Sequence, residues 1–189
     1  RRDGGTAWGR AGRRSLEDVG DFPSWCAAAV ERVPAEEARA VPYFAVAAQC
    51  YTVWWCLEPG QIPARQQLDP LRFGAKLLPH LTLIEAVGDG ADYYWRLCGE
   101  YAAKVMGTSL VGKRISQIEA DLGEGVLFRL ALNDVIKQCE PMFYVLRHRA
   151  MTGCMKRSYG VLLPLREETE GPRARPRYLL GACDWTTGE

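Results

Sequence analysis

The sequence lacks an excess of charge of either sign. Among its 189 residues, 24 Lys and Arg oppose 23 Asp and Glu, which leaves a net charge of +1. A general nucleic-acid binder needs a basic face to displace counterions from phosphates, so we expect no nucleic-acid partner. Hydrophobic residues make up 48% of the chain, which is enough for a globular core.

The sequence also lacks the spacings of common metal and catalytic motifs. Its seven cysteines are scattered, and no Cys-x-x-Cys pair is present, which excludes the usual structural zinc and redox motifs. The chain contains no Gly-x-Ser-x-Gly, His-Glu-x-x-His or Walker sequence. We therefore expect neither an enzyme nor a metal site. The scattered thiols favour a reducing compartment, so we expect a cytoplasmic protein.

Long hydrophobic runs are missing as well. The most apolar stretch, residues 41–57, falls short of the ~20 residues that span a bilayer and contains Gln49 and Thr52. We expect no membrane span. The stretch fits a buried helix, with a start near Ala35 or at Pro42 and an end at Glu58-Pro59-Gly60.

The N-terminal third of the chain is predicted to lie outside the main domain. Residues 1–20 are rich in Gly and Arg and are expected to be flexible. A short helix over residues 22–33 and the long helix at 35–57 would form a helical extension over residues 21–60. Asp69-Pro70 then predicts a capped helix over residues 70–77.

The remainder alternates between strands and helices in a defined order. Two strands are joined by Gly88-Asp89-Gly90, a hairpin signal, and three helices follow before three further strands. The predicted strands are 81–87, 92–98, 142–150, 156–165 and 178–185; the predicted helices are 100–106, 115–121 and 123–138. The order predicts an α+β domain over residues 61–189, a five-stranded antiparallel sheet with helices on one face.

Several short motifs along this order resemble a PAS-like family found mainly in alphaproteobacteria. They are Trp54-Trp55, Pro63-Ala64-Arg65, Asp69-Pro70, Leu78-Pro79, the strand end Trp95 to Gly99, and Met106-Gly107 through Leu110 to Lys113. Trp95 and Glu100 depart from the family pattern, where an aromatic Tyr or Phe and a small polar residue are expected. The resemblance covers about residues 43–185 and implies the PAS fold and a sensory or regulatory role. It names no ligand, because fold does not fix function.

A PAS domain holds its ligand between the sheet and the helices, which gives a set of candidate pocket residues. They are Tyr94, Arg96, Met106, Phe128, Tyr144, Leu146 and His148. Each is also a candidate for plain core packing. His148 is either a hydrogen-bonded core histidine or a group that contacts a ligand or metal. Arg96 would bind an anion, or form an internal salt bridge with Asp69 or Glu85. No motif supports haem or flavin, so the cofactor stays unknown.

The aromatic helix supplies a candidate interface. Tyr51, Trp54 and Trp55 would present a large apolar surface, so we expect a homodimer, and a protein partner in a signalling pathway is a further possibility. The predicted function is a small-molecule or partner-binding sensory domain that signals through its N-terminal helix. The alternatives are a ligand-free interaction adaptor and, less favoured, a small enzyme on an α+β scaffold.

Overall fold

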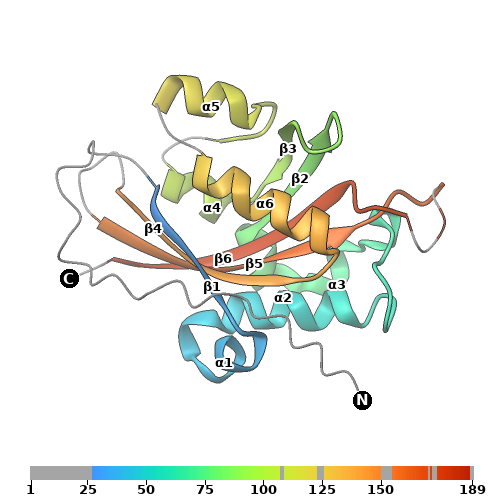
Figure 1. Ribbon diagram of the computed structural model, residues 1–189. Helices are drawn as coiled ribbons and strands as arrows, with labels where there is room; N and C mark the ends of the chain where they lie inside the picture. The colour runs from blue at the N-terminus through green and yellow to red at the C-terminus, as the bar shows by residue number, and fades with distance from the viewer. Residues whose placement is uncertain are drawn as a thin grey trace, which may run out of the picture.

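The structure, a computed structural model, describes residues 27–106, 109–122, 126–149, 155–169, 171 and 174–187. Its centre is a six-stranded antiparallel sheet in the order β1-β4-β5-β6-β2-β3 (Figure 1). The strands are β1 (Ala27–Val33), β2 (Leu81–Val87), β3 (Asp92–Cys98), β4 (Met142–Arg149), β5 (Met155–Leu165) and β6 (Tyr178–Thr187). The α+β class and the antiparallel sheet with helices are confirmed.

The number of strands differs from the prediction. Residues 27–33, predicted as part of a helix, form β1, which pairs with the edge of β4. Three alanines favour a helix weakly, and ladder hydrogen bonds to β4 override that preference. Val30 and Val33 point to opposite faces of the sheet, as a period of two requires, and each packs against a different core cluster.

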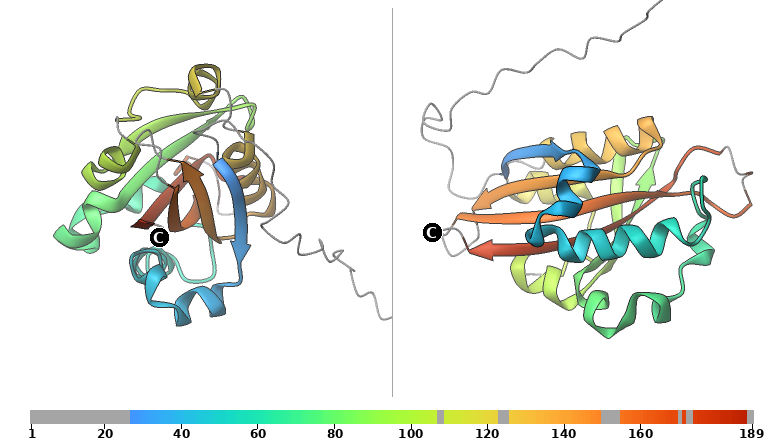
Figure 2. Two further views of the ribbon diagram at one scale, coloured as in Figure 1. Left: turned by 90° about the vertical axis from the view of Figure 1, so that its left-hand side faces the viewer. Right: turned by 90° about the horizontal axis from the view of Figure 1, so that it is seen from below.

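Helices cover both faces of the sheet, whereas the sequence predicted helices on one face (Figures 1 and 2). One face carries α1 (Ala35–Ala40), α2 (Ala45–Trp55) and α3 (Pro70–Leu77); the other carries α4 (Glu100–Met106), α5 (Ile115–Leu122) and α6 (Val126–Gln138). The predicted long helix is broken at Val41, where the backbone is extended, and a short 3-10 turn at Pro42–Phe44 leads into α2.

The two faces hold separate hydrophobic clusters. On the α2 face, Phe44, Cys50 and Trp54 pack with Phe143 and other sheet residues. On the α6 face, a second cluster joins Leu132, Val135 and Ile136 to the sheet. Alternate residues of one strand therefore enter different cores, because successive side chains point to opposite faces. The segment before residue 61 supplies both a strand and a covering helix to this sheet.

Local signals in the sequence are reproduced closely. The Asp69 carboxylate accepts a hydrogen bond of 2.9 Å from the Leu71 amide, so it caps α3 as predicted. The predicted hairpin between β2 and β3 turns through Gly88, Asp89 and Gly90, whose φ angles of 60°, 54° and 87° lie in the left-handed region. No helix among the described residues is long and apolar enough to cross a membrane.

Candidate functional site

The sheet face beneath α6 brings aromatic side chains together from three elements. Phe128 of α6 stacks on Trp95 of β3 at a centroid distance of 6.1 Å and meets Tyr144 of β4 edge-on at 6.2 Å. Trp95 and Tyr144 are each 5% exposed, and Leu146 packs at the margin of the same cluster. The face therefore offers several rings that point inward between the sheet and its covering helix.

A glycine on β5 makes room for one of these rings. Gly160 lies opposite Tyr144 in the β4–β5 ladder, and a Cβ atom at this position would come within 2.5 Å of the tyrosine Cζ and hydroxyl. The Tyr144 ring can therefore lie flat across β5 toward β6. There its hydroxyl is hydrogen-bonded to the Cys183 thiol, and burial raises the pKa of Tyr144 well above its usual value and that of Cys183 to about 12.

Two buried polar atoms on this face have no hydrogen-bond partner in the described part of the chain. They are Trp95 Nε1 and Ser158 Oγ. Ser158 is 1% exposed and lies on β5 between Leu146 and Trp185 of the neighbouring strands. A buried donor without a partner costs roughly 1–3 kcal/mol, so each atom marks a position where a ligand group would be stabilising.

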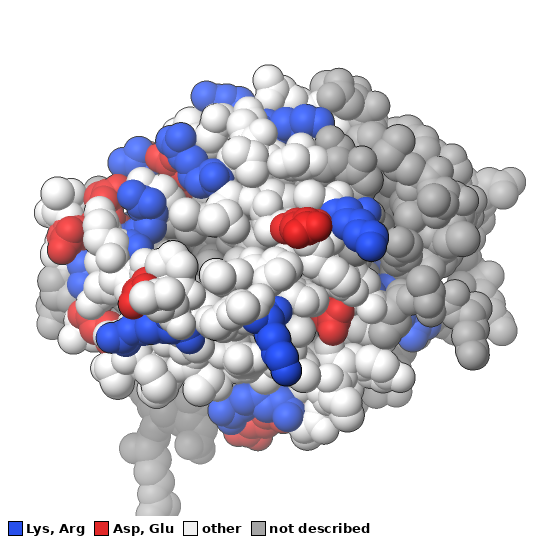
Figure 3. Space-filling model, turned by 180° about the vertical axis from the view of Figure 1, so that it is seen from behind, with Lys and Arg blue, Asp and Glu red and all other residues white. Residues whose placement is uncertain are grey.

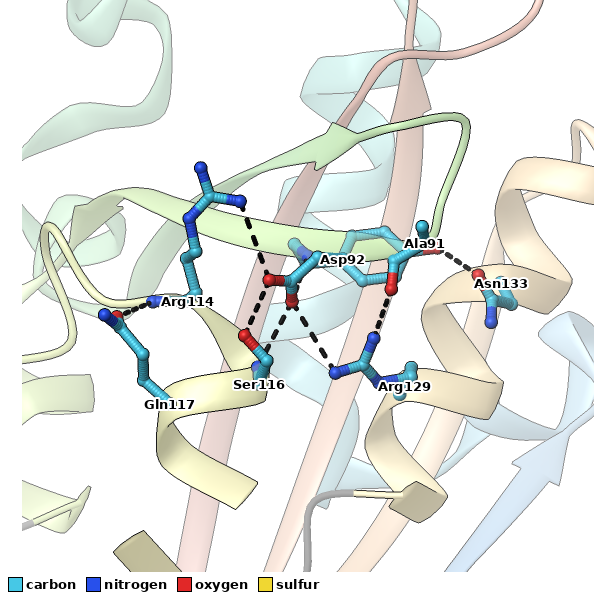
Figure 4. Close-up of polar contacts among 8 residues, drawn as sticks. Ala91, Asp92, Arg114, Ser116, Gln117, Arg129 and Asn133 are labelled. Atoms are coloured by element: carbon cyan, nitrogen blue, oxygen red, sulfur yellow. Dashed lines mark hydrogen bonds and ion pairs between the residues drawn. The ribbon is translucent and has the colours of Figure 1, made fainter. Parts of the chain in front are cut away.

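A polar network holds the start of β3 to α5 and α6 (Figure 4). The Asp92 carboxylate accepts hydrogen bonds from the Ser116 hydroxyl at 2.7 Å and from the Tyr93 amide at 2.8 Å. Arg129 of α6 lies 3.6 Å from the same carboxylate, and Arg114 lies 3.7 Å away. Burial opposes ionisation of Asp92, but these hydrogen bonds and the nearby Arg129 outweigh it, so the pKa of Asp92 is lowered.

Further contacts connect α6 to both edges of the sheet. The Tyr93 hydroxyl donates to Asn133 Oδ1 at 2.6 Å at the β3 edge, and burial raises the pKa of Tyr93 to about 12, so this hydroxyl stays protonated. At the β1 edge, Arg32 forms an ion pair of 3.2 Å with Asp134. A displacement of α6 would therefore be felt at β1 and β3 together.

A second charged group lies on the opposite face of the sheet. Glu85 of β2 is buried, with 5% of its side chain exposed, and is approached by Arg96 and Arg177, each about half exposed. Their Nε groups donate to Glu85 at 2.6 and 3.1 Å, respectively. Burial alone would raise the pKa of Glu85, but hydrogen bonds from Arg177 and Arg96 outweigh it and lower that pKa. The salt bridge from Arg96 to Glu85, one of the alternatives from the sequence, is therefore present.

The structure divides the predicted pocket residues between the two faces. Phe128, Tyr144 and Leu146 meet on the α6 face. Tyr94 and Arg96 lie on the other face, where the Arg96 guanidinium sits 4.6 Å from the Tyr94 ring centroid. The side chains of Met106 and His148 lie outside the described part of the structure.

The predicted interface residues differ among themselves. Trp54 is 3% exposed, and its Nε1 donates to the Pro164 carbonyl at 2.9 Å, so it belongs to the core of its own chain. Tyr51 is partly buried and stacks on Trp55 at 6.2 Å. Trp55, at the C-terminal end of α2, is 45% exposed, and Tyr43, in the 3-10 turn before that helix, is 56% exposed. The exposed aromatic surface of this layer therefore consists of Tyr43 and Trp55.

Sequence reasoning did not identify Trp95, Ser158, Cys183 or Asp92 as site residues, and it named Glu85 only as a possible salt-bridge partner of Arg96. Trp95 was noted as a departure from a family pattern. The alternation along residues 156–165 would have placed Ser158 on the same face as Gly160 and Leu162, which is a signal for an inward hydroxyl. The side chains that contact Asp92 come from residues 22 to 37 positions further along the chain, so no local pattern in the sequence predicts them.

Comparisons with known proteins found similarity only at the level of structure. No protein-family model matches the chain, and no curated protein matches it. Solved structures that resemble it include an RNA-binding light-oxygen-voltage (LOV) receptor, with 16% identity, a TM-score of 0.43, and coverage of 67% of this chain and 36% of that one. The LOV protein of Rhodobacter sphaeroides has 15% identity, a TM-score of 0.41, and coverage of 73% and 66%.

A fungal LOV domain photoreceptor has 11% identity and a TM-score of 0.40. The matched region covers 80% of this chain and 99% of the photoreceptor chain. The chain thus spans about a third of the length of the first structure and about two thirds of the second. These values describe a distant structural similarity to LOV domains, which belong to the PAS family.

Proposed function

We propose that this protein is a sensory or regulatory domain whose small-molecule ligand binds between the sheet and α6. The observation that carries the proposal is the pair of buried, unpartnered polar atoms on that face, Trp95 Nε1 and Ser158 Oγ. A native fold leaves few such groups, and each one requires an explanation. A bound molecule that pairs with either atom supplies one.

The surrounding side chains indicate the kind of molecule. An indole N–H is a donor only, so the ligand presents an acceptor, such as a carbonyl or ether oxygen, to Trp95. Phe128 and Tyr144 provide ring faces and edges for a flat or aromatic body. Among the described residues, the buried polar or charged side chains are Glu85, which lies on the opposite face, and the neutral Ser158, and this favours a neutral ligand.

The contacts of α6 supply a route for the signal. A ligand that moves Phe128 also moves Arg129 and Asp134 on the same helix, and these residues hold β3 and β1 respectively. Strand β1 ends one residue before α1, which leads through a turn into α2. Occupancy beneath α6 would in this way alter the N-terminal helices, where we propose self-association through the exposed Tyr43 and Trp55.

Native mass spectrometry of the purified protein tests the ligand. We expect a copurifying molecule in the wild type and reduced occupancy in Trp95→Phe, which removes the N–H and keeps an aromatic ring. Trp55→Phe is the matched control, because that indole is exposed and lies on the other face. An apo mass for the wild type, unchanged after addition of neutral aromatic compounds, would instead favour the ligand-free adaptor.

Self-association is tested separately by light scattering at tens of micromolar. We expect a dimer for the wild type and a monomer for Trp55→Glu. In the variant, association would bury the new glutamate carboxylate, which is energetically costly. A monomeric wild type would exclude this part of the proposal and leave the ligand site unaffected.

A further inference from the structure

The β2–β3–β6 end of the sheet carries three arginines, two tyrosines and a buried carboxylate, a group that the ligand site does not use. Glu85 lies at its centre and is paired in register with Tyr94 of β3 on one side and Tyr178 of β6 on the other. Arg96 and Arg177 reach the carboxylate from the two sides. Burying Glu85 costs desolvation energy that an apolar residue would avoid, so its presence calls for a reason beyond stability.

The geometry of the two guanidinium groups suggests that reason. Arg96 uses Nε and Nη2 on one Glu85 oxygen, at 2.6 and 2.5 Å, and Arg177 uses Nε and Nη2 on the other, at 3.1 and 2.7 Å. Within the described residues, no hydrogen bond or ion pair engages the remaining Nη1 group of either arginine. About half of each side chain is exposed. One buried carboxylate thus orients two guanidinium groups, and the Nη1 group of each arginine remains available to donate a hydrogen bond.

Backbone and ring contacts fix the arginines further. Arg96 is the extra residue of a β-bulge, since Leu83 pairs with Leu97 and Ile84 with Trp95. Bulges redirect a side chain and are frequent beside functional sites. The Arg96 guanidinium lies over the Tyr94 ring at 4.6 Å, while Arg177 and Arg65 lie 5.8 and 5.2 Å from the Tyr178 ring centroid. Such stacking lowers the entropy that an arginine loses on binding.

The side chains that contact the Glu85 carboxylate carry more positive charge than it neutralises. Arg96 and Arg177 together exceed the single charge of Glu85, and Glu167 is held by the Tyr178 hydroxyl at 2.9 Å. Leu97, next to Arg96, is 44% exposed. Arginine and tyrosine beside an exposed apolar residue are typical of protein interfaces. Figure 3 shows basic and acidic side chains interspersed along one side of the rear of the molecule, with a few further charged side chains nearer its middle.

We propose that Arg96 and Arg177, oriented by Glu85, form a docking surface for an acidic segment of a protein partner. A partner carboxylate would accept hydrogen bonds from the outward Nη1 groups, and Leu97 would pack against an apolar neighbour of that carboxylate. Charge-assisted hydrogen bonds of this kind are shorter and stronger than neutral ones. This surface lies on the face opposite α6, so its occupancy does not require a ligand beneath that helix.

Lysine substitutions test the docking surface without leaving Glu85 unpaired. Arg96→Lys and Arg177→Lys each keep one positive charge for Glu85 but remove the outward Nη1 group. The probe is a fluorescein-labelled oligoglutamate peptide, titrated at low ionic strength and followed by fluorescence anisotropy. We expect each lysine variant to bind about tenfold more weakly than the wild type, the loss expected for one charge-assisted hydrogen bond.

Arg39→Lys serves as the control, because this exposed arginine of α1 also stacks on a tyrosine but forms no ion pair within the described residues. We expect its affinity to stay within about twofold of the wild type. Equal losses in all three variants, or no binding by the wild type, would overturn the proposal. Displacement of the peptide by inorganic phosphate at the peptide's own concentration would also overturn it, because a free oxyanion would then be the better occupant.

Discussion

Replacing Ser158 with alanine should stabilise the ligand-free protein, which is opposite to the effect of most core substitutions. The Ser158 hydroxyl is buried and unpartnered, so its removal relieves a desolvation cost of roughly 1–3 kcal/mol. The lost oxygen leaves only a small void on β5, which offsets part of this gain. We therefore expect a net stabilisation of about 1 kcal/mol.

The matched control is Ser116→Ala, which removes a hydroxyl that does have a partner. Ser116 Oγ donates to the Asp92 carboxylate at 2.7 Å, so we expect a destabilisation of about 1 kcal/mol. Urea denaturation of both variants, with the protein refolded from denaturant to remove any bound molecule, measures the two effects on one scale. If Ser158→Ala were destabilised as much as Ser116→Ala, the Ser158 hydroxyl would have a partner, and the reasoning about the site would be refuted.

Three further substitutions probe the site and the packing of the two faces. Gly160→Ala should destabilise the fold by about 1–3 kcal/mol in urea denaturation, because the new methyl group meets the Tyr144 ring. Gly171→Ala is the control and should have little effect, because the space around Gly171 is open. Equal effects of the two substitutions would contradict the placement of the ring. Trp54→Phe should lower the denaturation midpoint by breaking the bond to the Pro164 carbonyl, and similar values for Trp54→Phe and Trp55→Phe would contradict the burial of Trp54. The pKa of Asp92 is lowered in the folded state, so its stabilising contribution is complete above its ordinary pKa and is lost as pH falls through the lowered value. Asp92→Asn should therefore flatten the acid limb of the stability–pH curve, and an unchanged limb would contradict the network.

Much of the fold could be predicted from local signals. Residues 81–87 and 92–98 were predicted as strands with the bounds that β2 and β3 have, because alternation and a glycine-rich turn act within a few residues. The same holds for α3, which carries its own cap at Asp69. Long-range pairing is different: β1 depends on the free edge of β4, which lies more than a hundred residues away.

The candidate site was predictable only in part, for the same reason. Tyr144 and Leu146 could be placed on one face from the period of their strand, whereas Phe128 was a candidate only through the expected pocket between the sheet and the helices. Both faces of the sheet are covered by helices, whereas the sequence predicted helices on one face. The sequence therefore did not show that inward-pointing residues divide between two faces. Tyr94 and Arg96 were therefore grouped with residues that lie on the opposite face.

The central claim is that Trp95 Nε1 donates a hydrogen bond to a ligand. The indole N–H proton resonance of Trp95 tests this claim most directly. The resonance can be assigned from its absence in Trp95→Phe and followed in a ¹H–¹⁵N spectrum of the protein as purified and after unfolding, dialysis and refolding. We predict that stripping shifts this resonance, while the resonance of exposed Trp55 stays in place. An unchanged Trp95 resonance, with an apo mass before and after stripping, would contradict the account.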